Sequence, residues 1–493
     1  MHSQLRPILL LGSAFWMVFL VGPANGQGQA DPARDSLDAK KATQERPSFR
    51  LLRQEETWGA LSGEEDELAS LKYIPLLHAS KTFLTIGGEA RSYGRWYRNE
   101  GWGAGPAQDG YLLQRFMLHG SLTAGGAPNG LWGRGFAQLK SGLIAGRDGP
   151  VYPPSRDRLG VNQAFLEVGF ARSPEREWLL RLGRQELHYG AGRMIAAREG
   201  PNVRLGFDAV LARYEGRRWR VDAFAAKPTE SLPGALDNGW MRGRTLWGTY
   251  LRRTRASSPS ISLYYFGTRR APSPQQPGLQ ATRHTVGARG YGTVGQLQYD
   301  LEGTAQFGHY HLNAPPESQG GTAEGPIRAW TLGGRVAYRV PGAAGRPEIG
   351  LLTDISSGDA GSTDALETFA APYPSGRFTG AGSRMGPGNL VNLRPFLGVR
   401  PHSNLHVQLR GHLFWRLRPT DGIYAIWGAP LRRSPSAKAR FVGGMPELLL
   451  RWDAGRHVNV AVEASHFLTG EFLRQTPAGQ AMTHVGLRAT YLF

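Results

Sequence analysis

The chain has 493 residues, of which 40% are hydrophobic, and its 58 Lys and Arg exceed its 39 Asp and Glu by a net charge of +19. The absence of Cys excludes thiol catalysis, disulfide bonds and metal sites with Cys ligands. The basic balance favours a polyanionic partner, but the basic residues are spread along the chain without a lysine-rich tail or a nucleic-acid module, which argues against nucleic acid.

The N-terminus has the features of a secretory signal peptide. Arg6 precedes an apolar run over 8–21, and Ala24, Asn25 and Gly26 provide the small residues of a cleavage site. The apolar run is shorter than the ~20 residues that a membrane-spanning helix needs, which disfavours a signal anchor. We therefore expect residues 1–26 to be removed and the rest of the chain to be exported.

Residues 27–80 are polar and show no hydrophobic periodicity. Glu55 and Glu56 form one acidic patch, and a second patch covers 64–67. This composition is typical of a flexible segment. We interpret it as a periplasmic leader that precedes the main domain, residues 81–493.

From residue 83 onward, apolar and polar residues alternate with the two-residue period of a β-strand. In the last such segment, Val485 and Leu487 fall on one face, His484 and Arg488 fall on the other, and the chain ends at Phe493. The segments are longer than the strands of an average soluble sheet and carry Trp and Tyr near their ends, which is typical of transmembrane barrels. The terminal aromatic residue resembles the C-terminal signature of bacterial outer-membrane proteins.

This pattern predicts an all-β protein, a transmembrane antiparallel β-barrel of about 18 strands, with 16 as the alternative count. The expected strands are 83–98, 111–122, 130–142, 160–171, 176–184, 207–215, 217–226, 243–255, 259–269, 281–292, 295–308, 327–340, 346–357, 388–399, 403–416, 437–452, 456–467 and 482–493. The stretches 185–206, 228–242, 309–326 and 358–387 are expected to be extracellular loops or loops folded into the lumen.

Basic residues repeat on the polar face of the predicted strands. If the alternation holds, those that project inward are Arg91, Arg115, Lys140, Arg181, Arg289, Arg335, Arg410, Arg451 and Arg488. Each could instead pair with a wall carboxylate such as Glu89, Glu167, Asp222, Glu302 or Glu463. Because Arg outnumbers these acids, keeps its charge and binds carboxylates bidentately, the set predicts a pore that favours anions.

The densest basic segment covers residues 181–198. Gly183 is expected to interrupt the strand, so that Arg184 and Glu186 both turn inward. Arg184, Glu186 and Arg193 are therefore predicted to lie at the constriction, in contact with one another or with the solute. Arg270, in contrast, is expected on an outer loop.

No catalytic constellation is recognisable in the sequence. It contains neither a Gly-x-Ser-x-Gly nor a His-Glu-x-x-His motif, and the 13 His residues lack metal-ligand spacing. The Ser-Gly-Asp run at 357–359 fits a turn better than a catalytic or cation site. We therefore expect no enzyme activity, no cofactor and no metal, and an outer-membrane hydrolase barrel is the alternative of a different class.

Several runs resemble the alginate export family. The most specific is the segment 183–193, a Gly-Arg-Gln-Glu-Leu-x-Tyr-Gly-x-x-Arg pattern that is followed by Phe207 and Asp208. Weaker similarities occur in the family's order, namely the leader runs at 54–58 and 71–76, the first strand at 86–91, and the landmarks at 357–359, 388–389 and 414–416. The resemblance extends over residues 50–493.

The resemblance implies an outer-membrane barrel of 18 strands with an arginine-rich constriction that passes polyuronate. We therefore expect passive transport of anionic solutes across the bacterial outer membrane, with an alginate-type polyuronate or its oligomers as the solute. A general or other anion-selective porin is the alternative within the same class. The expected partners are an anionic polysaccharide or oligosaccharide, outer-membrane lipid and periplasmic secretion partners, and the barrel is expected to be a monomer.

Overall fold

The structure is a computed structural model that describes residues 48–59, 69–76, 82–125, 130–173, 175–253, 259–272, 278–313, 323–361, 364–433, 437–476 and 478–493. The predicted signal peptide and most of the predicted leader lie outside the described residues. No helix in the described part of the chain is long and apolar enough to cross a membrane.

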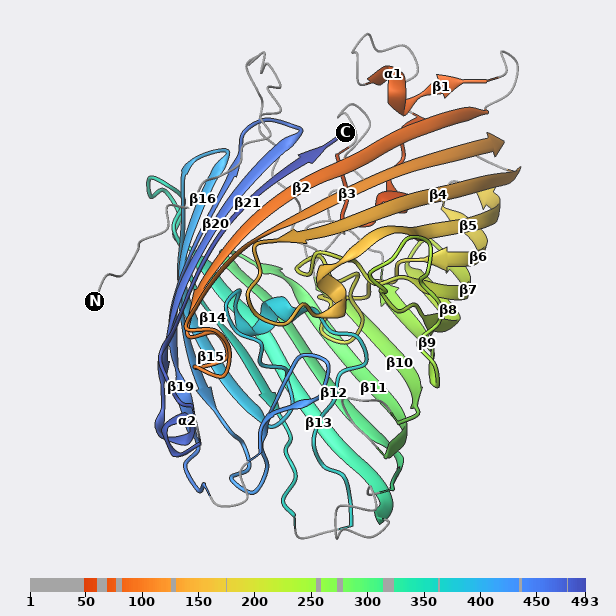
Figure 1. The fold of residues 1–493 in the computed structure, drawn as a ribbon. Helices are drawn as coiled ribbons and strands as arrows, with labels where there is room; N and C mark the ends of the chain where they lie inside the picture. The colour runs from red at the N-terminus through yellow and green to blue at the C-terminus, as the bar shows by residue number, and fades with distance from the viewer. Residues whose placement is uncertain are drawn as a thin grey trace.

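An antiparallel sheet of 18 long strands closes on itself to form a barrel (Figure 1). The strands are β2 (Phe83–Arg98), β3 (Gln108–Gly125), β4 (Gly130–Ala145), β5 (Asp157–Ser173), β6 (Arg176–Gln185), β7 (Phe207–Glu215), β8 (Trp219–Pro228), β9 (Arg244–Arg253), β10 (Ser260–Arg270), β11 (Leu279–Val294), β12 (Leu297–Leu312), β13 (Ala323–Arg339), β14 (Glu348–Ser356), β15 (Leu390–His402), β16 (Leu405–Trp415), β19 (Phe441–Asp453), β20 (Val458–Thr469) and β21 (Met482–Leu492). The predicted class and the predicted count of 18 are confirmed.

The first and last long strands close the barrel. β2 pairs with β3 on one side and with β21 on the other, and the remaining long strands pair with their neighbours in the sequence. A closed sheet has no free edge, so no strand in this wall exposes a row of unpaired backbone groups. The short β1 (Ile74–Pro75) adds to β2, and β17 (Ile423–Tyr424) pairs with β18 (Pro430–Arg432) outside the wall.

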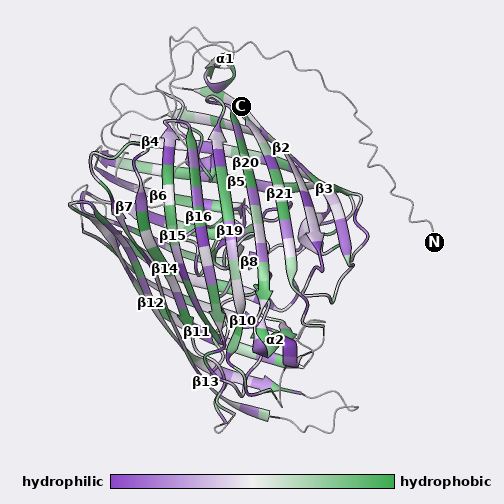
Figure 2. Cartoon of the chain, turned by 90° about the vertical axis from the view of Figure 1, so that its left-hand side faces the viewer, coloured by the Kyte–Doolittle hydropathy of each residue, from purple (hydrophilic) through white to green (hydrophobic). Residues whose placement is uncertain are grey.

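The wall has an apolar outer face and a largely polar inner face. On β5, Leu166 and Val168 point outward and are exposed, whereas Phe165 and Glu167 point inward and are buried. Figure 2 shows the resulting alternation of hydrophobic and hydrophilic residues along the strands. This is the pattern that a wall between lipid and an aqueous lumen requires.

The two ends of the barrel differ in the length of their connections. Phe493 and the start of β2 lie at one end, where turns such as 216–218, 295–296 and 403–404 are short. We call this the short-turn end, and the other end, with the connections 186–206, 229–243, 357–389 and 416–440, the long-loop end. The expected loop 309–326 is wrong in its extent, because β12 runs to Leu312 and β13 begins at Ala323.

Two long connections fold into the lumen instead of extending away from it. Residues 186–206 and 357–389 meet where the backbone N–H of Tyr373 donates to the carbonyl of Met194 over 2.8 Å. Their apolar residues, including Ile195 and Phe369, pack on inward aromatic rings of the wall such as Phe266. Figure 1 shows the short helix η4 (Gly376–Thr379) inside the ring of strands. The lumen is therefore partly filled by a second, internal core.

Candidate functional site

The connection 186–206 is fixed to the wall by two of the predicted inward arginines. Arg91 on β2 donates to the carbonyls of Glu199 and Pro201 over 2.7 and 2.8 Å. Arg115 on β3 donates from Nε to Glu89 over 2.8 Å and also forms an ion pair with Glu199. Because both guanidinium groups are buried and use their donors on this connection, they hold the internal segment in place.

The pKa values of Glu199 and Glu186, two carboxylates of this internal segment, are shifted in opposite directions. Burial opposes ionisation of Glu199, but Arg115, Arg204 and Arg91 outweigh it and lower its pKa to about 2. Glu186 is almost completely buried, and burial raises its pKa although Arg204 lies 2.9 Å from its Oε1 atom. Glu199 therefore carries the permanent negative charge that binds the surrounding arginines.

Arg184 does not turn into the lumen, which corrects the prediction for this residue. Gly183 adopts a φ of 125°, but the pairing with β7 continues through Arg184 and Asp208 without a shift. Arg184 therefore lies on the outward face together with Leu182. Its guanidinium forms a bidentate ion pair with the carboxylate of Asp208, with hydrogen bonds of 2.7 and 3.0 Å. The predicted contact between Arg184 and Glu186 is wrong. Arg184 is held by Asp208 on the outward face, whereas Glu186 follows the end of β6 and is bound by Arg204 and Asn162.

Arg193 reaches the lumen wall but meets neither Arg184 nor Glu186 among the described contacts. It pairs with Asp354 and lies 3.8 Å from Glu302, and its guanidinium packs over the Phe378 ring at 4.4 Å from the centroid. Arg193 thereby links one internal connection to the other and to the wall. The three residues expected at one constriction are thus distributed over three separate contacts.

Most of the other predicted inward residues form ion pairs with wall carboxylates. The described pairs are Lys140–Asp157 at 3.5 Å, Arg181–Glu167 at 2.6 Å, Arg289–Asp300 at 2.7 Å, Arg410–Glu447 at 3.5 Å, Arg488–Glu463 at 3.9 Å and Arg335–Glu348. Arg451 lies exposed near the short-turn end of β19. The pairing alternative therefore describes these residues well, and they form a charged lattice along the inner wall.

A second group of arginines at the long-loop end has no such acidic partners. We call Arg198, Arg244, Arg270 and Arg283 the mouth arginine cluster. Arg244 and Arg270 are direct partners on β9 and β10, Arg283 lies on β11, and Arg198 lies on the connection 186–206. Arg198, Arg244 and Arg270 lie around Tyr373, and Arg198 lies 5.8 Å from the centre of its ring.

The mouth arginine cluster is held mainly by neutral acceptors. Arg270 donates to the Pro372 carbonyl over 3.1 Å, and Arg283 donates to Gln306 over 3.3 Å. Among the described residues, no carboxylate pairs with any of its four members. The expectation that Arg270 lies on an outer loop is wrong, because Arg270 ends β10 and points inward. An anion at this position would therefore meet several positive charges without competition from the wall.

The described part of the predicted leader is not a free, flexible segment. Residues 48–59 enter the lumen at the short-turn end, where Arg53 donates to the Phe493 carbonyl over 2.9 Å. Arg204 donates to the Leu51 carbonyl over 2.7 Å, and Gln163 donates to the Gln54 side chain over 3.0 Å. The sequence does not predict that this segment binds inside the barrel, because a short polar segment has no hydrophobic periodicity.

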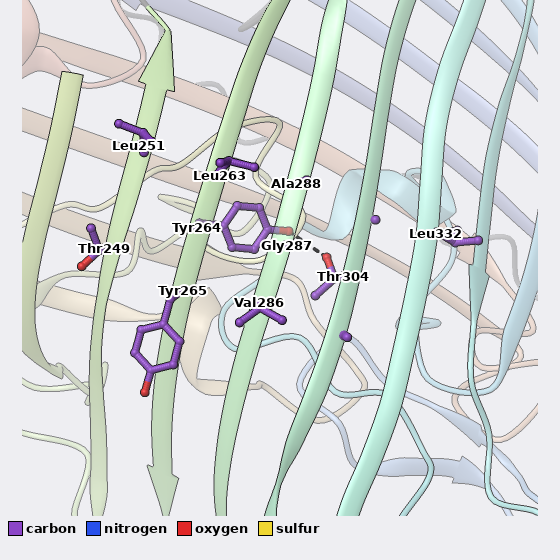
Figure 3. Close-up of a pocket in the computed structure, with 12 residues that line it drawn as sticks. Thr249, Leu251, Leu263, Tyr264, Tyr265, Val286, Gly287, Ala288, Thr304 and Leu332 are labelled. Carbon is purple, nitrogen blue, oxygen red and sulfur yellow. Dashed lines mark hydrogen bonds between the residues drawn. The ribbon is translucent and has the colours of Figure 1, made fainter. Parts of the chain in front are cut away.

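An apolar depression on β9–β13 is not part of this lumen (Figure 3). Leu251, Leu263 and Val286 line it, and all three point away from the lumen. Tyr264 points to the opposite side, where its hydroxyl lies 2.7 Å from that of Thr304. The depression therefore belongs to the lipid-facing surface.

A closed 18-strand barrel with an apolar outer belt and a charged lumen defines an outer-membrane channel. The family model for alginate export matches residues 82–487. The chain belongs to the alginate export family and is a protein of the bacterial outer membrane.

Solved structures share the fold at low sequence identity. OccK2 (OpdF) of Pseudomonas aeruginosa, in complex with glucuronate, aligns with a TM-score of 0.53 at 10% identity, over 83% of this chain and 98% of its own. OccK8 (OprE) of the same organism gives 0.52 at 11% identity over 83% and 98%, and OccD3 (OpdP) gives 0.52 at 10% over 86% and 93%. No curated protein sequence matches the chain significantly.

Proposed function

We propose that the protein conducts anionic solutes passively across the outer membrane, and that an alginate-type polyuronate or its oligomers is the solute. The observation that carries this proposal is the mouth arginine cluster, since its four cations lack acidic partners among the described residues. Uronate units carry one carboxylate each. A row of such groups would exchange hydration for guanidinium contacts as it passes.

Two further points support a uronate. Arg289 follows Arg283 on the inner face of β11, closer to the short-turn end, so a carboxylate would meet a further cation along the path, although Arg289 also pairs with Asp300. A barrel of the same fold, OccK2, was solved with glucuronate, which is a uronate. The proposal includes no catalytic step, so release of shorter products from an oligomer by the purified protein would contradict it.

Planar-bilayer recordings test the proposal directly. In a KCl gradient, the reversal potential should indicate anion preference, and the preference should weaken at high salt because the lumen charges are screened within ~8–10 Å. Tri-galacturonate should block the small-ion current, whereas the uncharged maltotriose should block it much less. Cation preference would refute the proposal, and anion preference without block by the oligomer would identify a general anion porin.

The mouth arginine cluster is tested with Arg244→Gln. This change should weaken the block by tri-galacturonate about threefold to tenfold, since a charge-assisted contact in a wet pore is worth less than the roughly 1.5–3 kcal/mol of a buried one. Arg217→Gln removes the same charge from an exposed turn and provides the matched control. Equal block in the two variants would show that the cluster does not contact the solute.

A further inference from the structure

The segment 48–59 lies across the short-turn end of the lumen. On one side, Arg53 binds the carbonyls of Phe493 and Gly88, at the seam between β21 and β2. On the other side, Glu55 lies 3.9 Å from Arg213 on β7 and 3.5 Å from Arg220 on β8. The segment therefore occupies part of the path that a solute must take between the two ends of the barrel.

The carboxylate of Glu55 lies within a second group of basic residues, which we call the inner arginine cluster. Its members are Arg134, Arg181, Arg213, Arg220 and Arg252. Two wall carboxylates form ion pairs with this group, namely Glu167 with Arg134 and Arg181, and Asp222 with Arg213 and Arg220. Glu215 on β7 also lies beside Arg220, so five cations face three wall carboxylates. This leaves a local surplus of positive charge, which the carboxylate of Glu55 partly balances.

Glu55 is the loosest acidic partner of these arginines. Asp222 binds both oxygens at 2.8 Å to Arg213 and at 3.1 and 3.3 Å to Arg220. The Glu55 distances are longer, and its side chain is still 30% exposed to solvent in the lumen. A carboxylate from another molecule could therefore take its place without disturbing the wall pairs.

The charge state of Glu55 fits this arrangement. Burial opposes its ionisation, but Arg220, Arg213, Arg181 and Arg252 outweigh burial and lower its pKa to about 2. Glu55 is therefore ionised at neutral pH, as a uronate is. The segment thus presents the same functional group to the inner arginine cluster that a uronate would present.

We propose that the inner arginine cluster is a carboxylate-binding site, and that Glu55 occupies it as an internal competitor of the solute. When a polyuronate carboxylate binds Arg213 and Arg220, Glu55 loses its partners and the segment 48–59 leaves the lumen. When no solute is present, the segment returns and narrows the short-turn end. This inference rests on the proposed function and adds to it a site and a way in which the solute opens its own path.

Single-cysteine reporters test the displacement, because the natural chain contains no Cys. Gln54→Cys places a thiol at a position that is 1% exposed while the segment is bound. In purified protein, a neutral water-soluble maleimide should label this thiol slowly, and tri-galacturonate should raise the labelling rate at least fivefold. Maltotriose, which lacks carboxylates, should leave the rate unchanged.

Removing the competing carboxylate should have the same effect as adding the oligomer. In the Gln54→Cys background, Glu55→Gln should raise the labelling rate at least fivefold without any oligomer. Glu175→Gln is the matched control, because it removes a carboxylate from an exposed ion pair with Arg217 at the same end of the barrel. Unchanged labelling in Glu55→Gln, or equal rates with tri-galacturonate and maltotriose, would overturn the proposal.

Leu52→Cys provides a second reporter at another buried position of the segment. It shows whether a change in labelling rate reflects the whole segment or only the substitution at position 54. Rapid labelling of both reporters without oligomer would show that the segment does not occupy the lumen, and would equally overturn the proposal. Labelling does not require conduction. An anion-selective barrel with a static segment therefore refutes this inference alone, whereas a barrel without anion preference refutes the proposed function.

Discussion

At the scale of single residues, the lumen arginines fall into two groups with different partners. Arg91 and Arg115 bind carbonyl and carboxylate groups of the connection 186–206, and they hold this connection against the wall. The mouth arginine cluster has only neutral acceptors among the described residues, and the proposed function assigns its charge to the solute. The presence or absence of an acidic partner, and not the number of arginines, distinguishes the two groups.

Glu199 provides a pH test of the support role. Its pKa is lowered from 4.5 to about 2, so its ionised form stabilises the fold above pH 4.5, and this contribution is lost as the pH falls towards 2. We expect Glu199→Gln to lower the melting temperature at pH 7, and the difference from the natural protein to shrink between pH 4.5 and pH 2. Thermal unfolding in detergent across this range measures it. A difference that stays constant with pH would contradict the assignment.

At the scale of elements, the seam between β2 and β21 determines whether the barrel closes. Phe493 extends this pairing beyond β21, because its N–H donates to Gly88 over 3.1 Å and its carbonyl accepts from the Gly88 N–H over 2.8 Å. Gly88 is required here, since a Cβ atom would lie 2.5 Å from both the Phe493 ring and the Met117 carbonyl. The last residue of the chain is therefore part of the closure.

Deletion of Phe493 should impair assembly. The deletion removes two hydrogen bonds of the seam and an acceptor of Arg53, so we expect a smaller fraction of protein that migrates as a folded barrel in unheated gel samples. Phe493→Leu keeps the backbone bonds and removes the ring, and this variant separates the two contributions. A normal folded yield of the deletion variant would show that the closure does not depend on this residue.

At the scale of the whole molecule, stability comes from a continuous ring of paired strands. The backbone groups of the long strands bond to a neighbour on each side, and none of these strands forms an edge. Local opening must therefore break bonds to two neighbours at once. The outer apolar belt and the closed ring together suit a lipid bilayer and a detergent micelle equally well.

The closed ring predicts resistance to heat in detergent. Unheated samples should migrate faster than boiled ones on a denaturing gel, and the protein should fractionate with outer membranes. The deletion of Phe493 serves as a weakened reference in the same gel. Identical migration before and after heating would contradict a closed barrel.

The barrel itself could be predicted because its pattern is periodic. In the strand that ends at Phe493, each second side chain faces lipid, so the sequence alone reveals the element and its face. The segment after Gly183 shows where this fails. The glycine at position 183 suggested a break. Its φ is indeed positive, but the register with Asp208 continues, and only three-dimensional pairing shows it.

The two arginine clusters could not be predicted for a related reason. Arg244, Arg270 and Arg283 lie on three successive strands, and their proximity depends on the register of those strands and not on their spacing in the sequence. Glu55 meets Arg220 only because a non-periodic segment folds back into the barrel. Contacts between wall and inserted segments follow from tertiary structure, for which a single sequence carries no local signal.

The hydrogen bonds of Arg53 also impose an order on assembly. Its two acceptors, the carbonyls of Gly88 and Phe493, belong to the first and the last long strand of the wall, and they come together only after the ring has closed. Arg53 therefore cannot complete its contacts on an open sheet. The N-terminal segment precedes the wall in the sequence, but its contacts at the seam can form only after the wall has closed.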